Sequence, residues 1–569
     1  MSATTVIEEN KNVKSHRLFA FLLGFCMFST GASGLVNEYV LATVTTYILG
    51  NSIEQFSIVI ALMMLMMGVS GLVQRHIGSK NLIEKFLGIE ILMAIAGGFA
   101  PLAIYAAYAY LNDHFMIVNY GFILLVGFLI GFEIPVVMRI VESKGIELTR
   151  NLSVVYAMDY IGAFIGAIIW VKFLLKTFPL TEISFIVAGF NFIVACIAIS
   201  YFMFTNEIKR FKRTIAAIMI SVACILIWGF KNNIELSKIM EQRLYDDPIV
   251  HSETTKYQHL VITENKNTGD VRLYINGSTQ FSSLDEKRYH EFLVHPALAI
   301  APKKENVLIL GGGDGLAVRE IKKYEDVKNI QLVDLDPAIV DLAKHNPLIR
   351  ELNEHAFEDA RINTANSTAI TSNGVKPLML SYDESSEARG TKEQWVTTLN
   401  VQSIDAANYL RTTSGVWDVV IIDFPDPSSV EVGKLYSKEF YNSLQRVISE
   451  DSIIAIQATS PYHSKDVYLS IKETMEYAGY KTLPYRQNIP SFGDWGFLLA
   501  TPIKNKNNLH EELKKVSSFE VSNDFITPEL LIASLAFGKN ELNTGRKCIN
   551  SLMQPCIVQM YNEYGWIIE

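Results

Sequence analysis

The sequence predicts a helical domain that crosses a membrane several times, followed by a Rossmann-like α/β domain with a small β-rich part in front of it. Two observations carry this prediction. Long apolar runs with charges at their ends fill the first 230 residues. Beyond residue 247, short β-rich runs alternate with helical stretches and turn residues, as in a soluble α/β domain. With 569 residues the chain is also long enough for two or more folded units.

Seven apolar runs predict the membrane part, a series too long for a globular protein. They cover residues 17–40, 56–73, 82–110, 115–140, 152–175, 183–204 and 214–230. We therefore expect an N-terminal tail over residues 1–16, a transmembrane domain of about seven spans over residues 17–231, and a domain boundary between residues 230 and 247.

Lys and Arg residues gather in alternate connections between these runs. They are Lys11, Lys14 and Arg17; Arg75, Lys80 and Lys85; Arg139, Lys144 and Arg150; and Lys209, Arg210, Lys212 and Arg213. The positive-inside rule places these connections and the N-terminus in the cytoplasm. Seven spans would then leave the C-terminal half on the other side, unless Gly31 and Gly34 break the first run into a re-entrant pair.

Four acidic residues lie in or beside the apolar runs: Glu38, Glu90, Glu133 and Asp159. A carboxylate inside a membrane is costly and therefore suggests a function, here a path for cations. Hydrogen bonding between helices or a place at the membrane surface explains the same residues. Both interpretations stay open.

Composition excludes several classes of site. The formal net charge of −9 argues against nucleic acid as the main partner and suits a cationic substrate. Of the five cysteines, three lie in apolar runs and two near the C-terminus, without the spacing of metal ligands. We predict no metal site and no disulfide framework.

A glycine-rich loop follows the first strand expected in the α/β domain. Residues 305–310 form that strand, Gly311, Gly313 and Gly315 lie in the loop, and a helix follows over residues 316–324. A second strand over residues 330–335 brings Asp334 about 20 residues after the glycines, the layout of a nucleotide-binding βαβ unit in which the acid bonds a ribose. Asp314 in the loop would repel a phosphate, so an adenosyl sulfonium fits better than a dinucleotide.

Further acids follow the next two strands, predicted over residues 396–401 and 417–422. Asp405 follows the first of them, and Asp423 and Asp426 follow the second. Because ligands of parallel sheets bind at the carboxyl ends of the strands, these acids and Asp314 and Asp334 predict one negative rim. Capping of a helix N-terminus explains one or two of them, Asp405 in particular.

Several segments of the second half resemble spermidine synthases. They are LYINGSTQFSSLDEKRYHEFLVHPAL at residues 273–298, GGGDG at 311–315, VDLDP at 333–337, DFPDP at 423–427 and LYSKEFY at 435–441. The likeness runs from about residue 257 to 500. It implies a class I methyltransferase-like fold, with a β-rich part over residues 245–302 and a Rossmann-like domain over residues 303–503. Several spans ahead of such a domain resemble the membrane-bound spermidine-synthase-like proteins of bacteria.

The resemblance implies roles for single residues. Asp423 is the expected general base with Tyr289 assisting; Gln258, Gly311, Gly313, Asp314, Asp334 and Asp405 are expected to bind the co-substrate; and Gln280, His290, Asp426, Gln457 and Phe492 are expected to bind the amine.

The sequence departs from the family pattern at five places. Asp334 stands where Glu is usual, Phe492 where Tyr is common, and Thr459 where many relatives carry an acid. Residues 362–396 look inserted, and we interpret them as a surface loop. Residues 504–569 form an extension without a recognisable motif. These departures leave the amine acceptor less certain than the reaction.

The implied reaction is transfer of an aminopropyl group from decarboxylated S-adenosylmethionine to an amine such as putrescine, without a metal or a permanently bound cofactor. A small-molecule N-methyltransferase and a non-catalytic polyamine transporter or sensor stay open as alternatives. The expected partners are the amine, the lipid bilayer and, from the family, a second copy of the chain. We expect a bacterial inner membrane protein whose catalytic domain is cytoplasmic, where the co-substrate is made, although the loop charges with seven spans indicate the opposite side.

Overall fold

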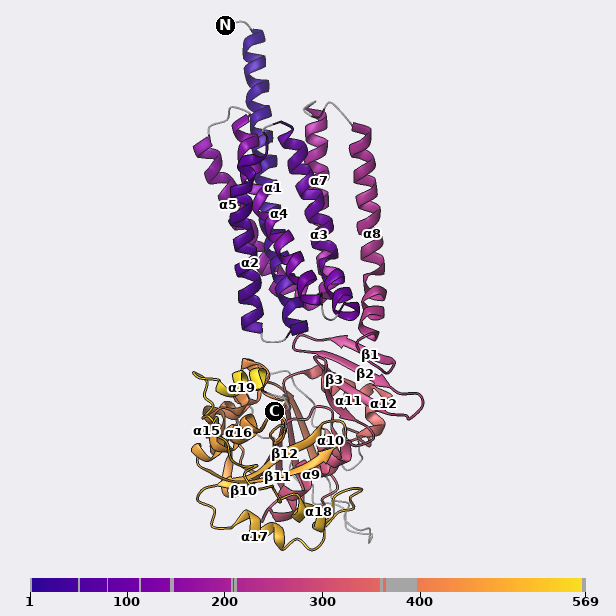
Figure 1. Cartoon of the computed structure of the whole chain (residues 1–569), viewed down its shortest axis with the longest axis vertical. Helices are drawn as coiled ribbons and strands as arrows, with labels where there is room; N and C mark the ends of the chain where they lie inside the picture. The colour runs from indigo at the N-terminus through magenta and orange to yellow at the C-terminus, as the bar shows by residue number, and fades with distance from the viewer. Residues whose placement is uncertain are drawn as a thin grey trace, which may run out of the picture. The chain divides into compact units, whose positions relative to one another are not determined.

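The structure is a computed structural model that describes residues 3–49, 52–78, 80–111, 114–143, 148–205, 208, 212–358, 362–364 and 397–564. The chain divides into two compact units, Met1–Pro248 and Ile249–Glu569 (Figure 1). The junction lies directly after the stretch where the composition changes.

The first unit is a bundle of long helices. They are α1 (Ala3–Leu49), α2 (Ser52–Val73), α3 (Leu82–Tyr110), α4 (Phe115–Ser143), α5 (Leu148–Ile169), which continues through a π-helical segment (Trp170–Leu174) into the short α6 (Leu175–Thr177), then α7 (Leu180–Phe204) and α8 (Lys212–Gln242). Each predicted apolar run falls within one of seven long helices of the described residues. Helix α1 passes Gly31 and Gly34 without a break, so the first run is not a re-entrant pair. Most of the tail expected over residues 1–16 also belongs to this helix.

Glycines let helices α1 and α5 pack backbone against backbone. A Cβ atom at Gly31 would lie 2.2 Å from the carbonyl oxygen of Asp159, and one at Gly162 would lie 2.0 Å from that of Phe28. No larger residue fits at either position without moving a helix. Small residues serve this purpose where helices associate without a hydrophobic driving force.

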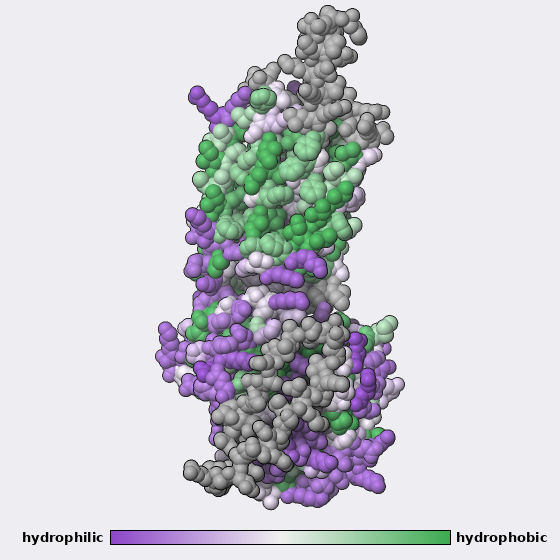
Figure 2. Space-filling model, turned by 180° about the vertical axis from the view of Figure 1, so that it is seen from behind, coloured by the Kyte–Doolittle hydropathy of each residue, from purple (hydrophilic) through white to green (hydrophobic). Residues whose placement is uncertain are grey.

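The surface of the bundle is rich in apolar side chains, which form a broad hydrophobic band in Figure 2. Phe204, Ile117 and Phe164 are among the most exposed of them. Among the described residues, six helices are long and apolar enough to cross a membrane by length and composition: Glu54–His76, Leu82–Tyr110, Phe115–Ser143, Leu152–Thr177, Leu180–Phe204 and Lys212–Gln242. Helix α1, which holds the first predicted span, is not among them. Glu90 and Glu133 are buried inside the bundle.

The second unit begins with a small antiparallel sheet of strands β1 (Ile249–Thr254), β2 (His259–Glu264), β3 (Val271–Ile275) and β4 (Ser278–Ser282). The elements that follow are α9 (Glu286–Ile300), β5 (Asn306–Gly311), α10 (Leu316–Ile321), β6 (Asn329–Asp334), α11 (Pro337–His345), α12 (Pro347–Leu352), β7 (Ile362–Thr364), β8 (Thr397–Ser403), α13 (Ala406–Thr412), β9 (Trp417–Asp423), α14 (Val430–Gly433), α15 (Lys438–Leu444), β10 (Ile448–Gln457), α16 (Lys465–Tyr477), β11 (Tyr480–Ile489), β12 (Gly493–Pro502), α17 (Leu509–Lys514), α18 (Pro528–Ala533) and α19 (Cys556–Tyr564).

Eight of these strands form one sheet in the order β11-β12-β10-β9-β5-β6-β8-β7, parallel from β10 to β7. Strand β9 shows why the sheet is buried on both faces. Val419 and Ile421 pack into the core on one face, and Val420 and Ile422 pack into the core on the other. A continuous apolar run is the pattern of such a strand.

Two expectations for this unit need correction. The expected insertion over residues 362–396 begins with a strand, β7, which pairs with β8 at the edge of the sheet; residues 365–396 lie outside the described residues. The expectation of no disulfide is wrong for Cys548 and Cys556, which are bonded to each other. Their separation of eight residues matches no motif, and only the turn between them brings their Cα atoms within 6.6 Å.

Candidate functional site

The glycine loop brings the ends of three strands together. Gly311 has a φ of +85°, and a Cβ atom there would lie 2.0 Å from the carbonyl oxygen of Asp423, its register partner on β9. At Gly313 a Cβ atom would lie 2.8 Å from a carboxylate oxygen of Asp334 on β6. Because glycine at position 311 tolerates the backbone angle and both glycines tolerate the close approach, this loop lets the acids that end the strands on either side of β5 approach it.

Asp334 organises two turns at once. Its Oδ2 accepts a hydrogen bond of 3.0 Å from the backbone N–H of Gly313, and its Oδ1 accepts one of 2.9 Å from that of Asp336. Burial raises the pKa of Asp334 to about 6, despite these two donors. The Asp334 carboxylate therefore lies at the end of β6, where a ribose would bind.

Asp423 ends β9 and is bonded to the phenol predicted to assist it. The Tyr289 hydroxyl donates a hydrogen bond of 2.5 Å to Asp423 Oδ1. Burial raises the pKa of Asp423 to about 6, and the negative charge of Asp314 adds to the shift. A carboxylate that titrates this close to neutrality is suited to accept a proton from a substrate.

Asp314 in the glycine loop and His290 on α9 both act electrostatically on Asp423. Asp314 Oδ1 accepts a hydrogen bond of 2.9 Å from the N–H of Leu316 at the start of α10, and burial raises the pKa of Asp314. Burial of His290 on α9 opposes its cationic form, but its hydrogen bond of 2.9 Å to Glu286 outweighs that effect and raises its pKa. In its protonated form, His290 offsets part of the negative charge of Asp314 and Asp423.

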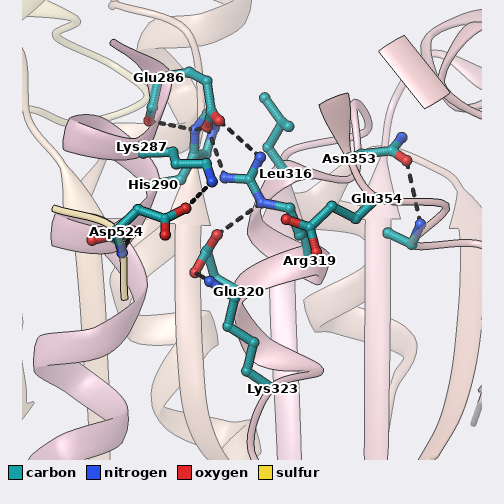
Figure 3. A network of polar contacts seen from close by, with 12 residues as sticks. Glu286, Lys287, His290, Leu316, Arg319, Glu320, Lys323, Asn353, Glu354 and Asp524 are labelled. Atoms are coloured by element: carbon teal, nitrogen blue, oxygen red, sulfur yellow. Dashed lines mark hydrogen bonds and ion pairs between the residues drawn. The ribbon is translucent and has the colours of Figure 1, made fainter. Parts of the chain in front are cut away.

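A buried ion-pair network holds Glu286 in place (Figure 3). Two nitrogens of Arg319 donate to the two carboxylate oxygens of Glu286, each over 2.8 Å, and Arg319 Nε donates to Glu320 over 2.8 Å. Glu320 in turn bonds His295 over 2.9 Å. This network was not predicted from the sequence. The one local sign of it is that Glu286 lies four residues before His290, one helical turn away.

Asp426, three residues after Asp423, has two differently placed oxygens. Oδ2 accepts hydrogen bonds of 2.9 Å from the hydroxyl groups of Thr459 and Tyr561. Oδ1 is buried and has no hydrogen-bond partner among the described residues. Burial raises the pKa of Asp426 to about 6, against the effect of its hydroxyl donors. Tyr561 belongs to the C-terminal extension, in which the sequence analysis found no functional residue.

Two other predicted residues form the wall around these acids. Gln457 is buried and donates to the carbonyl of Phe424 and, over 2.8 Å, to the Tyr436 hydroxyl. Phe492 packs edge-on against Tyr289, with 5.9 Å between ring centroids. Both side chains therefore shape the site around the acid cluster.

The remaining three predicted residues make their hydrogen bonds and ion pairs with residues outside the acid cluster. Gln258 lies in the connection between β1 and β2, and its backbone N–H donates to the Thr255 hydroxyl. Thr255 in turn donates a hydrogen bond of 2.6 Å to Asp336, in the turn after β6. Gln280 lies on β4, and its amide donates to the carbonyl of Ser278. Asp405 caps α13 and forms an ion pair of 2.5 Å with Lys434, so the capping interpretation holds for it.

No group of three or more metal-ligating side chains occurs in the part of the chain that the structure describes. Instead the carboxyl ends of β5, β6 and β9 carry four acids with raised pKa values: Asp314, Asp334, Asp423 and Asp426. Such a cluster binds cations and accepts a proton.

Comparison with known proteins gives a consistent result. A family model described as "Spermine/spermidine synthase domain" matches residues 286–373 and 392–512. A protein of Oceanobacillus iheyensis named "Polyamine aminopropyltransferase" is 34% identical, covering 94% of this chain and 95% of that protein. "Polyamine aminopropyltransferase 1" of Streptomyces coelicolor is 38% identical over 85% of this chain and 84% of that protein.

A crystal structure of spermidine synthase with the transition-state analogue AdoDATO aligns with 52% of this chain and 88% of that chain, at 23% identity and a TM-score of 0.42. The relatives named above match both the helical unit and the α/β unit, and they are more than 30% identical over most of their length. This chain therefore belongs to the polyamine aminopropyltransferase family, the spermidine-synthase type of transferase.

Proposed function

We propose that this chain transfers an aminopropyl group from decarboxylated S-adenosylmethionine to a diamine such as putrescine, giving spermidine and 5′-methylthioadenosine. The observation that carries the proposal is the cluster of Asp314, Asp334, Asp423 and Asp426 around the glycine loop. Both substrates are cations, and family membership agrees with this chemistry.

The chemical step is a displacement at carbon. Asp423 takes a proton from the substrate ammonium, and the freed amine attacks the methylene carbon next to the sulfonium. The new C–N bond forms as the C–S bond breaks, and its electron pair stays on sulfur, giving a neutral thioether. The product nitrogen carries the positive charge. Positioning of the two reactants contributes about 7–11 kcal/mol in such reactions.

Charge favours the decarboxylated co-substrate over S-adenosylmethionine itself. The carboxylate of S-adenosylmethionine would face Asp314 and Asp423, whose burial strengthens repulsion between like charges. A methyltransferase would need a cation at this place. Isothermal titration with each compound tests the point: we expect tighter binding of the decarboxylated form, and a preference for S-adenosylmethionine would support methyl transfer instead.

Turnover tests the assignment directly. We expect the purified full-length chain to convert decarboxylated S-adenosylmethionine and putrescine to spermidine, read by mass spectrometry. Asp423→Asn should lower kcat by about 10²–10⁴-fold because it removes the base. Asp451→Asn, at an exposed position of β10, is the matched control. A chain that binds putrescine but yields no spermidine would be a sensor or transporter and would contradict the proposal.

The proposal also includes a place in the cell: the helical unit crosses a bacterial inner membrane. Its apolar surface and its six helices of sufficient length and hydropathy support this. The chain should remain in the membrane fraction after carbonate extraction, and release into the soluble fraction would contradict the proposal. The pairing of two chains implied by the family belongs to the same proposal, and light scattering of the detergent-solubilised protein measures it.

A further inference from the structure

The C-terminal extension supplies a residue to the amine side of the site. Helix α19 carries Tyr561, whose hydroxyl donates to Asp426 Oδ2 over 2.9 Å. The matched family domain ends at residue 512, so this contact comes from outside it. Together with Thr459, Tyr561 occupies one oxygen of Asp426, and the other, the buried Oδ1, has no hydrogen-bond partner among the described residues.

A disulfide and a small apolar contact hold α19 against the α/β unit. Cys556, the first residue of α19, is bonded to Cys548. Ile557 and Val558 are buried in the core on this face of the sheet. Val558 packs so closely on Gly433 that a Cβ atom there would lie 2.3 Å from it. Since α19 has only nine residues, it depends on these attachments to keep its place.

We propose that Tyr561 is a positioning residue for Asp426 and that the Cys548–Cys556 disulfide keeps it in place, so that the affinity for the acceptor amine depends on this bond. Tyr561 and Thr459 fix the carboxylate with Oδ1 facing the amine, where an N–H of the substrate ammonium binds. The two hydroxyl donors also hold the pKa of Asp426 lower than burial alone would set it. This inference rests on the proposed function and names the residues that serve its amine site.

Steady-state kinetics of the full-length chain with putrescine test the role of Tyr561. Tyr561→Phe should raise the KM for putrescine about tenfold, because a hydrogen bond to a charged group is lost, while the KM for the co-substrate changes less than twofold. The acidic limb of putrescine binding should move to higher pH, because the variant raises the pKa of Asp426. Tyr477→Phe, at an exposed position on α16, is the control.

Reduction tests the role of the disulfide, because the other three cysteines are not bonded to one another. Dithiothreitol should raise the KM for putrescine of the wild-type chain several-fold and reversibly. The double variant Cys548→Ser with Cys556→Ser should show the raised KM without reductant and no response to it. In Tyr561→Phe, reduction should add little, because both changes remove the same contact.

The outcomes separate this inference from the proposed function. If the wild-type chain makes no spermidine, the proposed function fails. If it makes spermidine and Tyr561→Phe leaves both the KM for putrescine and the pH limb unchanged, only the role of Tyr561 fails. If reduction changes the KM values of both substrates equally, the disulfide is a general support of the fold and the second half of the inference is overturned.

The direction of the helices and the distribution of basic residues between the two ends of the bundle indicate which side of the membrane the transferase unit faces. Seven long helices in the described residues precede Ile249, and α1 begins at the end of the bundle opposite to the one where α8 ends (Figure 1). The basic residues Arg75, Lys80, Lys85, Arg139, Lys212 and Arg213 belong to the end at which α1 begins. At the other end, Lys172 and Lys176 lie between α5 and α7, and Lys231, Lys238 and Arg243 lie in and directly after the last turns of α8, while the α1–α2 and α3–α4 connections carry neither Lys nor Arg.

We further infer that the transferase unit faces the extracytoplasmic side of the membrane. The positive-inside rule places the basic end of the bundle in the cytoplasm, and α8, which starts at that end, leads the chain to the opposite end before the transferase unit begins. A disulfide in the transferase unit agrees, since such bonds persist in oxidising compartments and are rare in the cytosol.

Cysteine labelling tests this orientation in spheroplasts that express the full-length chain. The labelled variants are made in a chain that carries Cys548→Ser and Cys556→Ser, and this background alone is the control. His114→Cys places a thiol at the end of the bundle where α3 connects to α4, and Lys80→Cys places one at the end where α2 connects to α3. A membrane-impermeant maleimide should label His114→Cys in intact spheroplasts and Lys80→Cys only after permeabilisation. The reverse pattern, or free thiols at Cys548 and Cys556 in the wild-type chain, would overturn the inference.

Discussion

At the scale of single residues, the site depends on carboxylates that burial makes basic. Asp334, Asp423 and Asp426 each have a pKa of about 6, because the ionised form loses water on burial. Their ionisation is therefore the costly state in the empty site, and a bound cation offsets this cost. A bound cation supplies the positive charge that these carboxylates lack when the site is empty.

This predicts the pH dependence of catalysis. Asp423 must be ionised to accept a proton, and its folded pKa lies above the ordinary value of 3.8. We therefore expect kcat/KM to be constant above about pH 7 and to fall at least tenfold per pH unit below about pH 6, because Asp426 titrates in the same range as Asp423. Folding stability has the opposite sign: burial of the ionised group costs stability above pH 6, and this cost disappears as the pH falls towards 4. A kcat/KM that stays constant down to pH 4.5 would exclude Asp423 as the base.

The phenol of Tyr289 gives a second prediction at this scale. Tyr289→Phe removes the hydrogen bond of 2.5 Å to Asp423, and because that bond lowers the pKa of Asp423, the acidic limb of kcat/KM should move upward. We expect kcat to fall about 10–100-fold, as for the loss of a hydrogen bond to a charged group. The pH profile of the variant, compared with that of the wild-type chain, measures both effects. An unshifted limb would show that the two groups act separately.

At the scale of elements, the turn after β5 decides whether the acids meet. Gly311→Ala should abolish activity, because a left-handed φ costs an alanine about 1–2 kcal/mol and its Cβ would collide with the carbonyl of Asp423. Gly415→Ala, where the nearest atom would lie 3.4 Å away, is the control and should keep activity. Activity assays and urea unfolding measure the two effects. Full activity of Gly311→Ala would show that β5 and β9 do not approach as described.

The buried network between α9 and α10 gives a prediction for stability. Arg319→Met leaves Glu286 and Glu320 without their shared cation, which should cost about 3–5 kcal/mol of unfolding free energy. His290 should also lose its fixed orientation, because Glu286 is no longer held (Figure 3). Lys328→Met, which breaks an exposed ion pair with Glu305, should leave the unfolding midpoint nearly unchanged. Equal effects of the two variants would contradict this role of the network.

At the scale of the whole molecule, the two compact units should respond separately to a defect in one of them. Gly162→Leu would push α5 away from Phe28 on α1 and destabilise the bundle. Gly189→Leu on α7, where a Cβ meets no atom within 4 Å, is the matched control. We expect Gly162→Leu to lower the thermal transition of the helical unit while spermidine formation at 25 °C persists. Loss of both together would show that the units fold as one.

The sequence alone predicted the apolar helical runs, the strands β5, β6, β8 and β9 of the α/β unit, and the acids that follow these strands. These features rest on local patterns: apolar runs of membrane length, apolar strands buried on both faces, and glycines before a helix. The tertiary structure decided which partners those residues find. Asp405 is neutralised by Lys434, Glu286 is held by Arg319, and Tyr561 reaches Asp426 from 135 residues away. Contacts between residues so far apart in the chain depend on how the elements pack, and no local pattern encodes them.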